Sequence, residues 1–309
     1  MDWKFQSIAV VGSGAIGLYY GGRLASAGED VRFLTRSDFE AVSRDGLQVE
    51  SIHGDFRLPR VNAYQSPLEM GPVDLVIVAW KATSNGQLRE VLTPLLHSNT
   101  QVLTLQNGLG NCESLAEIVG ADRVLGAMCF VCINRVAPGV VSHSAGGSMS
   151  IGEWRPNPLG RAVELERRFK AANIPATAVE SLEQAQWEKL VWNIPFNGLS
   201  VADGGVTTDY LLATPERENH LRVLMTEVIA GGRALGLQLD DGLIDYHINR
   251  TRPMGPYRTS SMIDYVEGRE VEVFPIWEEP LRQAREAGVG MPQTELLLKR
   301  IRERLDTRG

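Results

Sequence analysis

Residues 7–28, SIAVVGSGAIGLYYGGRLASAG, constrain the fold of this chain more than any other stretch. Ile8, Val10 and Val11 form a short apolar run of the kind that makes a strand buried on both faces of a parallel sheet. A glycine-rich turn follows at once, and the residues after it predict a helix that ends at Gly28. The turn consists of Gly12, Ser13, Gly14, Ala15, Ile16 and Gly17. Strand, glycine turn and helix in direct succession predict the first unit of a Rossmann-type sheet.

The spacing of these glycines matches a turn that binds the pyrophosphate of a dinucleotide cofactor. The first glycine of such a turn permits a tight bend, the second lets the backbone approach the phosphates, and the third lets the helix pack on the strand. The amides that follow lie at a helix N-terminus, where unpaired N–H groups and the helix dipole favour an anion. A glycine turn without a ligand is the alternative, but the strand before it and the helix after it favour a cofactor site.

The end of the second predicted strand, residues 30–34, indicates which cofactor binds. An NAD site usually has Asp or Glu here, about 20 residues past the glycines, to bind the ribose hydroxyls. This chain has Thr35, Arg36 and Ser37 instead. A guanidinium beside a hydroxyl suits a 2′-phosphate, so we expect NADPH or NADP+, with Arg36 as its ligand. Asp38 lies close enough to keep NAD as a second possibility.

Composition excludes several classes of protein. The chain has 309 residues and a formal net charge of −7, which argues against nucleic acid as a partner because phosphate binding needs a basic surface. The apolar runs are too short to span a bilayer and no leader precedes the first strand, so we expect a cytoplasmic protein without a membrane partner. Cys112, Cys129 and Cys132 cannot all pair, and we interpret Cys129 and Cys132 as core residues. No metal site is expected.

Two polar residues follow predicted strands at the ends where ligands bind. Residues 73–79, VDLVIVA, predict a central strand, and Lys81 comes just after it. Residues 101–105 predict the next strand, which leads into Asn107. In open α/β sheets, ligands bind outside the carboxyl ends of the strands, so both side chains are candidates for a cofactor or substrate site. The alternatives are a solvated loop lysine and an Asn-Gly turn.

From residue 183 onward the pattern becomes helical. Further strands are predicted at 124–133, 139–152 and 175–179, and a helix at 161–172. Helices are then predicted at 214–236, 240–250, 260–267, 276–288 and 292–305, with Thr214 as an N-cap. The sequence therefore predicts an α/β fold with two domains: an N-terminal Rossmann-type parallel sheet over residues 1–180, and an all-α C-terminal domain over residues 181–309.

The first helix of the second domain carries an unusual polar stripe. Lys189, Asn193 and Asn197 are spaced i, i+4 and i+8, so they share one helix face among largely apolar neighbours. Burying such groups without partners costs a few kcal/mol, so their grouping implies partners or a ligand. A structural network of amides is an equal alternative. Pro195 is expected to kink this helix and to leave a free carbonyl beside the stripe.

Two further polar residues lie near the other end of the domain. Ser260 would hydrogen-bond a carboxylate, and Glu272 would hold an ammonium group or a substrate hydroxyl. Read individually, Ser260 is a helix N-cap and Glu272 is an exposed strand residue.

Together these motifs resemble the ketopantoate reductase (2-dehydropantoate 2-reductase) family, in order and over almost the whole chain. The matching features are the glycine turn, Lys81, Gln106-Asn107-Gly108, Trp187-x-Lys189-Leu190-x-x-Asn193-x-x-x-Asn197, and Ser260 with Gly268-Arg269-x-x-Glu272. The resemblance implies an NADPH-dependent reductase with its active site in a cleft between a Rossmann domain and a helical domain. It implies reduction of ketopantoate to pantoate, a step of pantothenate and coenzyme A biosynthesis.

The resemblance also implies residue roles. The lysine matching Lys189 is the general acid, and the glutamate matching Glu272 binds substrate and supports that lysine. The residues matching Asn193, Asn197 and Ser260 contact the substrate, whereas those matching Lys81 and Asn107 serve near the cofactor and the reacting carbonyl. The small-molecule substrate would be a 2-oxo acid, reduced by hydride transfer to its ketone carbon.

Three alternatives remain open at this point. A reductase of another 2-oxo acid would differ around Thr207, where some family members have asparagine, and around residues 252–258. A non-catalytic NADP sensor would need Arg36 but not the lysine stripe. A dehydrogenase of a phosphorylated or sugar-acid substrate would use a basic pocket formed by Arg250, Arg252 and Arg258. A homodimer is possible.

Overall fold

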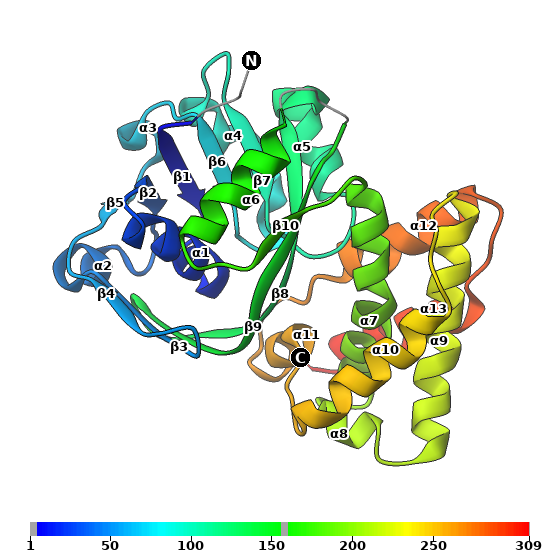
Figure 1. The fold of residues 1–309 in the computed structure, drawn as a ribbon. Coiled ribbons are helices and arrows are strands. Elements are labelled where there is room, and N and C mark those ends of the chain that lie inside the picture. Colours follow the sequence, from blue (N-terminus) through cyan, green and yellow to red (C-terminus); the bar gives the residue numbers. More distant parts are fainter. Residues whose placement is uncertain (1–4, 156–159, 309) are drawn as a thin grey trace. The chain divides into compact units, whose positions relative to one another are not determined.

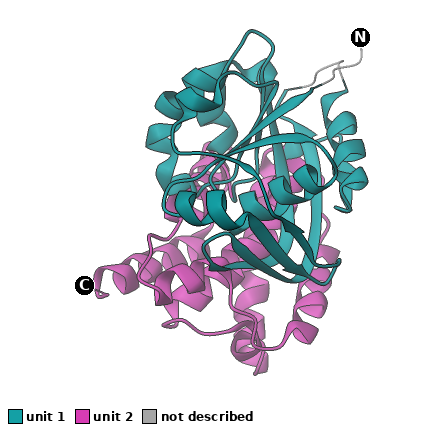
Figure 2. Cartoon of the chain, turned by 90° about the vertical axis from the view of Figure 1, so that its left-hand side faces the viewer, with its two compact units in different colours: residues 1–107, 111–182 teal, residues 108–110, 183–309 magenta. Residues whose placement is uncertain are grey.

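A computed structural model describes residues 5–155 and 160–308 of the chain. The chain divides into two compact units, which Figure 2 shows in different colours. The first unit comprises residues 1–107 and 111–182, and the second comprises residues 108–110 and 183–309. The short stretch 108–110 therefore groups with the second unit although its neighbours in sequence belong to the first.

The first unit is built on one ten-stranded sheet with the order β4-β3-β9-β8-β7-β6-β1-β2-β5, in which β10 pairs with β9 (Figure 1). Its strands are β1 Ser7–Val11, β2 Asp30–Leu34, β3 Leu47–Ser51, β4 Phe56–Leu58, β5 Asn62–Tyr64, β6 Leu75–Val78, β7 Gln101–Thr104, β8 Val124–Ala137, β9 Val140–Glu153 and β10 Ala176–Ala178. Among the described residues, each strand predicted from the sequence is present.

Strands β5, β2, β1, β6, β7 and β8 pair in parallel, which confirms the Rossmann-type core. The register places Val11 opposite both Leu34 and Val78, and Val78 opposite Thr104. These four residues end their strands, so the segments that follow begin in one row across the sheet. The chain order reverses between β1 and β6, and such a switch point is where α/β sheets bind their ligands.

The rest of the sheet is mixed, so antiparallel pairs extend the parallel Rossmann-type core. β8 and β9 form a long antiparallel hairpin, and β4 pairs antiparallel with β3. The hairpin has register shifts between Phe130 and Val131 and between Cys132 and Ile133. Cys129 is buried, as expected, whereas Cys132 is only partly buried, because the burial of β8 decreases from Phe130 toward the exposed end of the strand.

The first unit also has six α-helices and three short 3-10 segments among its described residues. They are α1 Ala15–Ser26, α2 Phe39–Asp45, α3 Pro67–Met70, η1 Ala82–Gln87, α4 Leu88–Leu92, η2 Thr93–Leu95, α5 Asn111–Val119, η3 Ala121–Arg123 and α6 Arg161–Ala171. Tyr19 and Tyr20 of α1 and Phe169 of α6 are fully buried in one core with the sheet.

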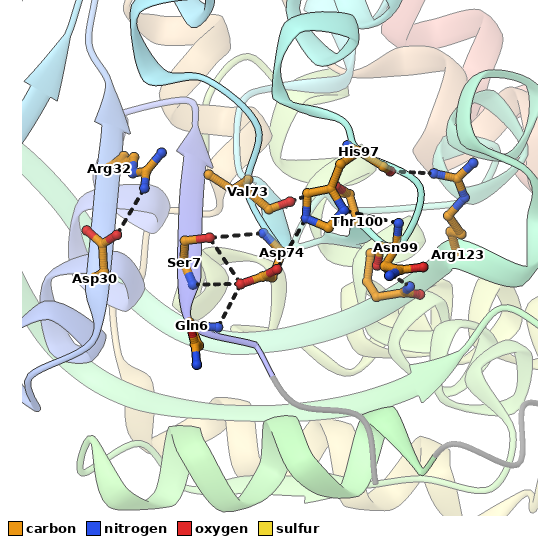
Figure 3. A network of polar contacts seen from close by, with 11 residues as sticks. Gln6, Ser7, Asp30, Arg32, Val73, Asp74, His97, Asn99, Thr100 and Arg123 are labelled. Carbon is orange, nitrogen blue, oxygen red and sulfur yellow. Dashed lines mark hydrogen bonds and ion pairs between the residues drawn. The ribbon is translucent and has the colours of Figure 1, made fainter. Parts of the chain in front are cut away.

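A polar network joins the amino-terminal ends of β1, β6 and β7 (Figure 3). The Asp74 carboxylate accepts hydrogen bonds from the backbone N–H groups of Gln6 (2.8 Å) and Ser7 (3.1 Å). It also accepts from the Ser7 hydroxyl (3.1 Å) and lies 3.2 Å from Nε2 of His97. The other ring nitrogen of His97 accepts from the backbone N–H of Asn99 at 3.1 Å. The network holds the sheet at the edge opposite to the glycine turn.

The described elements of the second unit are all helical, which confirms the all-α prediction. They are α7 Leu182–Ala202, α8 Thr208–Leu211, α9 Pro215–Ala234, α10 Gly242–Thr251, η4 Arg252–Met254, α11 Ser260–Val266, a π-helical turn η5 Phe274–Glu278, α12 Glu279–Glu286 and α13 Pro292–Asp306. Thr214 caps α9 through a hydrogen bond from Arg217 N, as expected. No described helix combines the length and apolar character needed to cross a membrane.

The second unit packs around α7. Trp187 on α7 is fully buried, and Gly231 and Gly232 of α9 lie against its ring. A Cβ at either glycine would lie 3.2 Å from a ring carbon of Trp187, so α9 packs tightly on the indole at these two positions. Pro195 does not end α7, because the helix continues to Ala202.

Candidate active site

The glycine turn of the first unit combines two crowded positions with one open position. Gly12 has a φ of +102°, and a Cβ there would lie 2.4 Å from the backbone nitrogen of Trp80. A Cβ at Gly17 would lie 2.0 Å from the carbonyl oxygen of Gly12. At Gly14, by contrast, a Cβ would have no atom within 4 Å. Packing thus requires the first and third glycines, and the second faces open space at the start of α1.

The segments that follow β6 and β7 are joined by a chain of side-chain amides that sequence analysis did not identify. The Asn85 side-chain oxygen accepts from the indole N–H of Trp80 (3.2 Å) and from the side-chain amide of Gln106 (2.7 Å). Asn85 in turn donates to the side chain of Asn111 at 3.0 Å, and Asn111 donates to the carbonyl of Asn107 at 2.9 Å. These bonds fix the backbone of Asn107 relative to the end of β6. Amides on separate short segments leave no periodic signal in the sequence from which such a chain of hydrogen bonds could be found.

Arg36 and Lys81 lie on segments that begin in the same row of the sheet. Arg36 is exposed, and its guanidinium carbon lies 5.9 Å from the ring centre of Trp80. It donates a hydrogen bond to the side-chain oxygen of Gln87 in η1. Lys81 is half-buried at the start of that segment. Arg36 therefore lies beside the aromatic ring of Trp80, just past the carboxyl ends of the parallel strands.

The Asp38 carboxylate, which kept NAD as a second possibility, is turned into the protein. It is buried, with 3% of its surface exposed, and its carboxylate forms an ion pair with Arg135 of β8. The acidic residue that favoured NAD is thus turned into the protein, while Arg36 stays exposed.

These residues fit a dinucleotide that carries a 2′-phosphate. The open space at Gly14 lies at the N-terminus of α1, where backbone N–H groups attract a pyrophosphate. An exposed guanidinium at the end of β2 suits a phosphate better than a ribose diol. Gly12, Ser13, Gly14, Ala15, Ile16, Gly17, Arg36, Lys81 and Asn107 all follow carboxyl ends of parallel strands.

The polar stripe of the second unit is buried along α7. Lys189 is 8% exposed, Asn193 5% and Asn197 1%. A buried ammonium group and two buried amides are costly unless each has polar partners. The stripe therefore provides donors and acceptors in an environment where electrostatic interactions are stronger than in water.

Asn197 and Ser260 are brought together by the fold. The Asn197 side-chain oxygen accepts from the Ser260 hydroxyl at 3.4 Å and from the backbone N–H of Ser261 at 3.1 Å. Thr259, not Ser260, is the N-cap of α11, because its side chain accepts from Met262 N. Ser260 is the first residue of the helix and is exposed, so its hydroxyl can face a ligand.

Glu272 is buried, 7% exposed, between α11 and the π-helical turn η5. It is neither exposed nor in a strand, which overturns the alternative interpretation of this residue. Five positions further on, the indole N–H of Trp277 donates to the carbonyl of Ile194 on α7 at 3.1 Å. This buried bond ties the segment that follows Glu272 to the helix that carries Lys189. Trp277 could not be predicted from the sequence, because no sequence pattern distinguishes a tryptophan that bonds a neighbouring helix from one that only packs in the core.

Another buried chain of hydrogen bonds links α7 to α10. The indole N–H of Trp192 donates to the Thr251 hydroxyl at 2.9 Å, and that hydroxyl donates to the carbonyl of His247 at 2.7 Å. His247 Nε2 lies 3.2 Å from the carbonyl of Glu188. Burial, together with Arg250, lowers the pKa of His247 to about 4, despite the carbonyl contact that opposes the shift. His247 is therefore neutral at physiological pH.

The basic pocket expected of a phosphorylated or sugar-acid substrate is weakened by internal pairing. Arg252 forms an ion pair with Glu218, which also binds Arg222. The guanidinium carbon of Arg250 lies 5.4 Å from the ring centre of Tyr246. Two of the three arginines are thus engaged with side chains of their own unit.

Two family models match the chain. Residues 8–156 match "Ketopantoate reductase PanE/ApbA", and residues 181–305 match "Ketopantoate reductase PanE/ApbA C terminal". A 2-dehydropantoate 2-reductase from Nostoc sp. is 42% identical over 302 residues, which cover 96% of this chain and 94% of that relative. The chain belongs to the ketopantoate reductase family. It is accordingly an oxidoreductase, and the resemblance seen in the sequence is confirmed.

Solved structures agree with the ketopantoate reductase assignment. A 2-dehydropantoate 2-reductase from Geobacter metallireducens superposes with a TM-score of 0.94 at 44% identity, covering 96% of this chain and 99% of that one. The enzyme from Methylococcus capsulatus gives a TM-score of 0.89 at 29% identity, over 98% and 97% of the two chains. D-mandelate dehydrogenase shares the fold at 20% identity, with a TM-score of 0.88 over 98% of this chain and 99% of that one.

Proposed function

We propose that this chain reduces 2-dehydropantoate to pantoate with NADPH as the hydride donor. The observation that carries the proposal is the stripe of Lys189, Asn193 and Asn197, buried along α7 in a chain of the ketopantoate reductase family. Reduction of a ketone needs a proton donor for the oxygen on which negative charge develops, and a desolvated ammonium group is suited to that role. A lysine on a solvated helix face would be less suited to donating that proton.

The proposed roles follow from residue type and burial. Lys189 stabilises the developing charge and transfers a proton to the oxygen. Glu272, buried in the same unit, orients the ammonium group and the substrate. Asn193, Asn197 and Ser260 bind the substrate. The side-chain oxygen of Asn197 accepts hydrogen bonds from two residues of α11. The NH2 group of the same side chain would donate to the substrate.

The cofactor belongs to the first unit in this proposal. NADPH, when bound, supplies the hydride that the ketone carbon accepts. The glycine turn, Gly12 to Gly17, would hold the pyrophosphate at the N-terminus of α1, and Arg36 would bind the 2′-phosphate. Lys81 and Asn107 would serve beside the cofactor and the reacting carbonyl. Residues 1–180 are thus proposed as the NADP-binding domain, and residues 181–309 as the substrate-binding and catalytic domain.

A second substrate class rests on Thr207. This residue is the N-cap of α8, and its hydroxyl donates to the Asp209 carboxylate at 2.5 Å. Asparagine occupies the equivalent position in some family members, and threonine presents a shorter side chain whose proton is already used. A reductase of another 2-oxo acid therefore stays a candidate.

Cytoplasmic location and a homodimer also stay predictions. Light scattering of the purified protein would test the homodimer.

The test is NADPH oxidation by the purified protein, with ketopantoate beside a panel of branched and hydroxylated 2-oxo acids, and with NADH as control cofactor. Ketopantoate turned over well above the panel supports the proposal. Turnover of another acid replaces the substrate and keeps the chemistry. Tight NADPH binding without turnover of any acid contradicts a catalytic role and favours a sensor of NADP.

A further inference from the structure

The buried carboxylate of Asp38 lies in the loop that carries the proposed 2′-phosphate ligand, two positions after Arg36. Its two oxygens are both engaged. Oδ1 accepts from Arg135 at 2.7 Å and from the Ser37 hydroxyl at 2.9 Å, and Oδ2 accepts from the backbone N–H of Gly139 at 3.4 Å. Arg135 and Gly139 belong to the far end of the β8–β9 hairpin, almost a hundred positions away in the chain.

The ion pair is asymmetric in its exposure. The side chain of Asp38 is 4% exposed, whereas that of Arg135 is 42% exposed. A carboxylate buried to this degree needs a charged partner, because an uncompensated buried charge is strongly unfavourable. Among the described residues, Arg135 is the cationic side chain that forms an ion pair with Asp38.

We propose that Arg135 is a positioning residue that sets the preference for NADPH over NADH, by holding Asp38 inside the protein and away from the cofactor's ribose. The inference rests on the proposed use of NADPH. Acidic side chains at the end of the second strand bind ribose hydroxyls in NAD sites. This chain has a carboxylate, Asp38, four residues past the end of β2, in the same loop as Arg36. The difference from an NAD site is therefore the direction of the carboxylate as well as the presence of Arg36.

Removing Arg135 would release the carboxylate toward water, since it could not stay buried unpaired. In the loop it would compete for the Arg36 guanidinium and repel the 2′-phosphate, both of which weaken NADPH binding. The same carboxylate would accept hydrogen bonds from the 2′- and 3′-hydroxyls of NADH. The two cofactors are thus expected to respond in opposite directions.

The experiment compares dissociation constants of NADPH and NADH, measured by cofactor fluorescence on the whole protein without substrate. For Arg135→Gln we expect the ratio of the NADH to the NADPH dissociation constant to fall about tenfold. Titrations with 2′,5′-ADP and 5′-ADP, followed by calorimetry, isolate the 2′-phosphate from the nicotinamide. Circular dichroism and thermal melting confirm that the exposed Arg135 has been replaced without loss of the fold.

Three control variants separate positioning from packing. Arg135→Lys keeps the positive charge and should keep most of the preference. The double variant Arg135→Gln with Asp38→Asn removes the released charge, so it should restore the preference for NADPH. Asp38→Asn by itself should leave NADPH binding within about twofold of the wild type, because Arg36 is unaffected.

Equal weakening of both cofactors by Arg135→Gln would overturn the inference, as would a double variant that fails to recover. A wild-type protein that prefers NADPH while Arg135→Gln changes nothing overturns the inference and leaves the proposed function intact. A wild-type protein that does not prefer NADPH overturns both the proposed cofactor and the role of Arg135.

Discussion

The side-chain oxygen of Asn197 accepts a hydrogen bond of 3.1 Å from the backbone N–H of Ser261. The bond joins α7 to the first turn of α11, across 64 positions of the chain. The first N–H groups of a helix have no partner inside the helix, so a side chain that accepts from one stabilises the helix end. Asn197 therefore has a structural role in addition to the proposed contact with substrate.

Asn197→Ala should destabilise the protein by about 1–3 kcal/mol, because it leaves the buried N–H of Ser261 unsatisfied. Urea unfolding measures the change. Ser260→Ala is the matched control, since it removes the exposed hydroxyl but keeps the bond between Asn197 and Ser261. We expect that control to lose activity and keep stability. Equal stability of the two variants would contradict the structural role of Asn197.

The glycine turn allows a sharper separation of folding from cofactor binding. Gly12→Ala would place a Cβ 2.4 Å from the Trp80 backbone at a φ of +102°, so it should destabilise the protein or prevent its folding. Gly14→Ala meets no protein atom within 4 Å and should keep the melting temperature. Its methyl group would occupy space proposed for the pyrophosphate, so NADPH affinity should fall at least about tenfold.

Melting curves and NADPH titrations of the two variants decide the matter. If the Gly14→Ala protein binds NADPH as tightly as the wild type does, the pyrophosphate is not bound at Gly14.

Lys189→Ala should lower kcat by about 10²–10⁴-fold, since it removes a proton donor from the proposed site. The dissociation constant for NADPH should stay within about twofold, because Lys189 belongs to the helical unit and the proposed cofactor ligands belong to the first unit. Lys299→Ala is the control, a lysine whose side chain is 72% exposed, and it should change neither value. A loss of cofactor affinity as large as the loss of rate would contradict the assignment of Lys189 as general acid.

The elements with a strong local signal were predictable from sequence. The parallel strands β1 and β6 contain continuous apolar runs, and the glycine turn marks the start of α1. Helix α7 was expected because the sequence pattern becomes helical from residue 183, and the spacing of Lys189, Asn193 and Asn197 fits one face of that helix. In each case neighbouring residues carry the information, so no knowledge of the tertiary fold is needed.

The surroundings of Asp38, Ser260 and Glu272 could not be predicted from neighbouring residues in the sequence. Asp38 is a candidate ribose ligand by its position in the sequence, because its neighbours do not indicate the ion pair with Arg135 on the β8–β9 hairpin. Ser260 taken individually is a candidate N-cap, but Thr259 takes that place in α11. Glu272 follows a pattern of alternating polar residues that suggests a strand, but tertiary packing buries it beside a π-helical turn. At Glu272, tertiary packing overrides the local strand propensity.

The final prediction concerns stability at low pH and the network at the amino-terminal edge of the sheet (Figure 3). Burial by itself would raise the pKa of Asp74, but hydrogen bonds from the backbone of Gln6 and Ser7, from the Ser7 hydroxyl and from His97 outweigh it and lower the pKa. The folded state thus binds this proton less tightly than the unfolded state does. Asp74 therefore stabilises the fold above its unfolded pKa, and that stabilisation disappears as the pH falls through the lowered value.

Asp74→Asn should cost about 1–3 kcal/mol in the free energy of unfolding near pH 7, because the amide accepts fewer hydrogen bonds and presents N–H to His97 Nε2. The difference from the wild type should shrink as the pH falls below about 4, where the unfolded carboxyl is already protonated. Urea unfolding across this pH range measures both effects. Asp30→Asn is the control, since Asp30 is 44% exposed in a surface pair with Arg32 and should change stability by less than about 1 kcal/mol. A difference between Asp74→Asn and the wild type that is independent of pH would show that the carboxylate's charge contributes nothing to the fold.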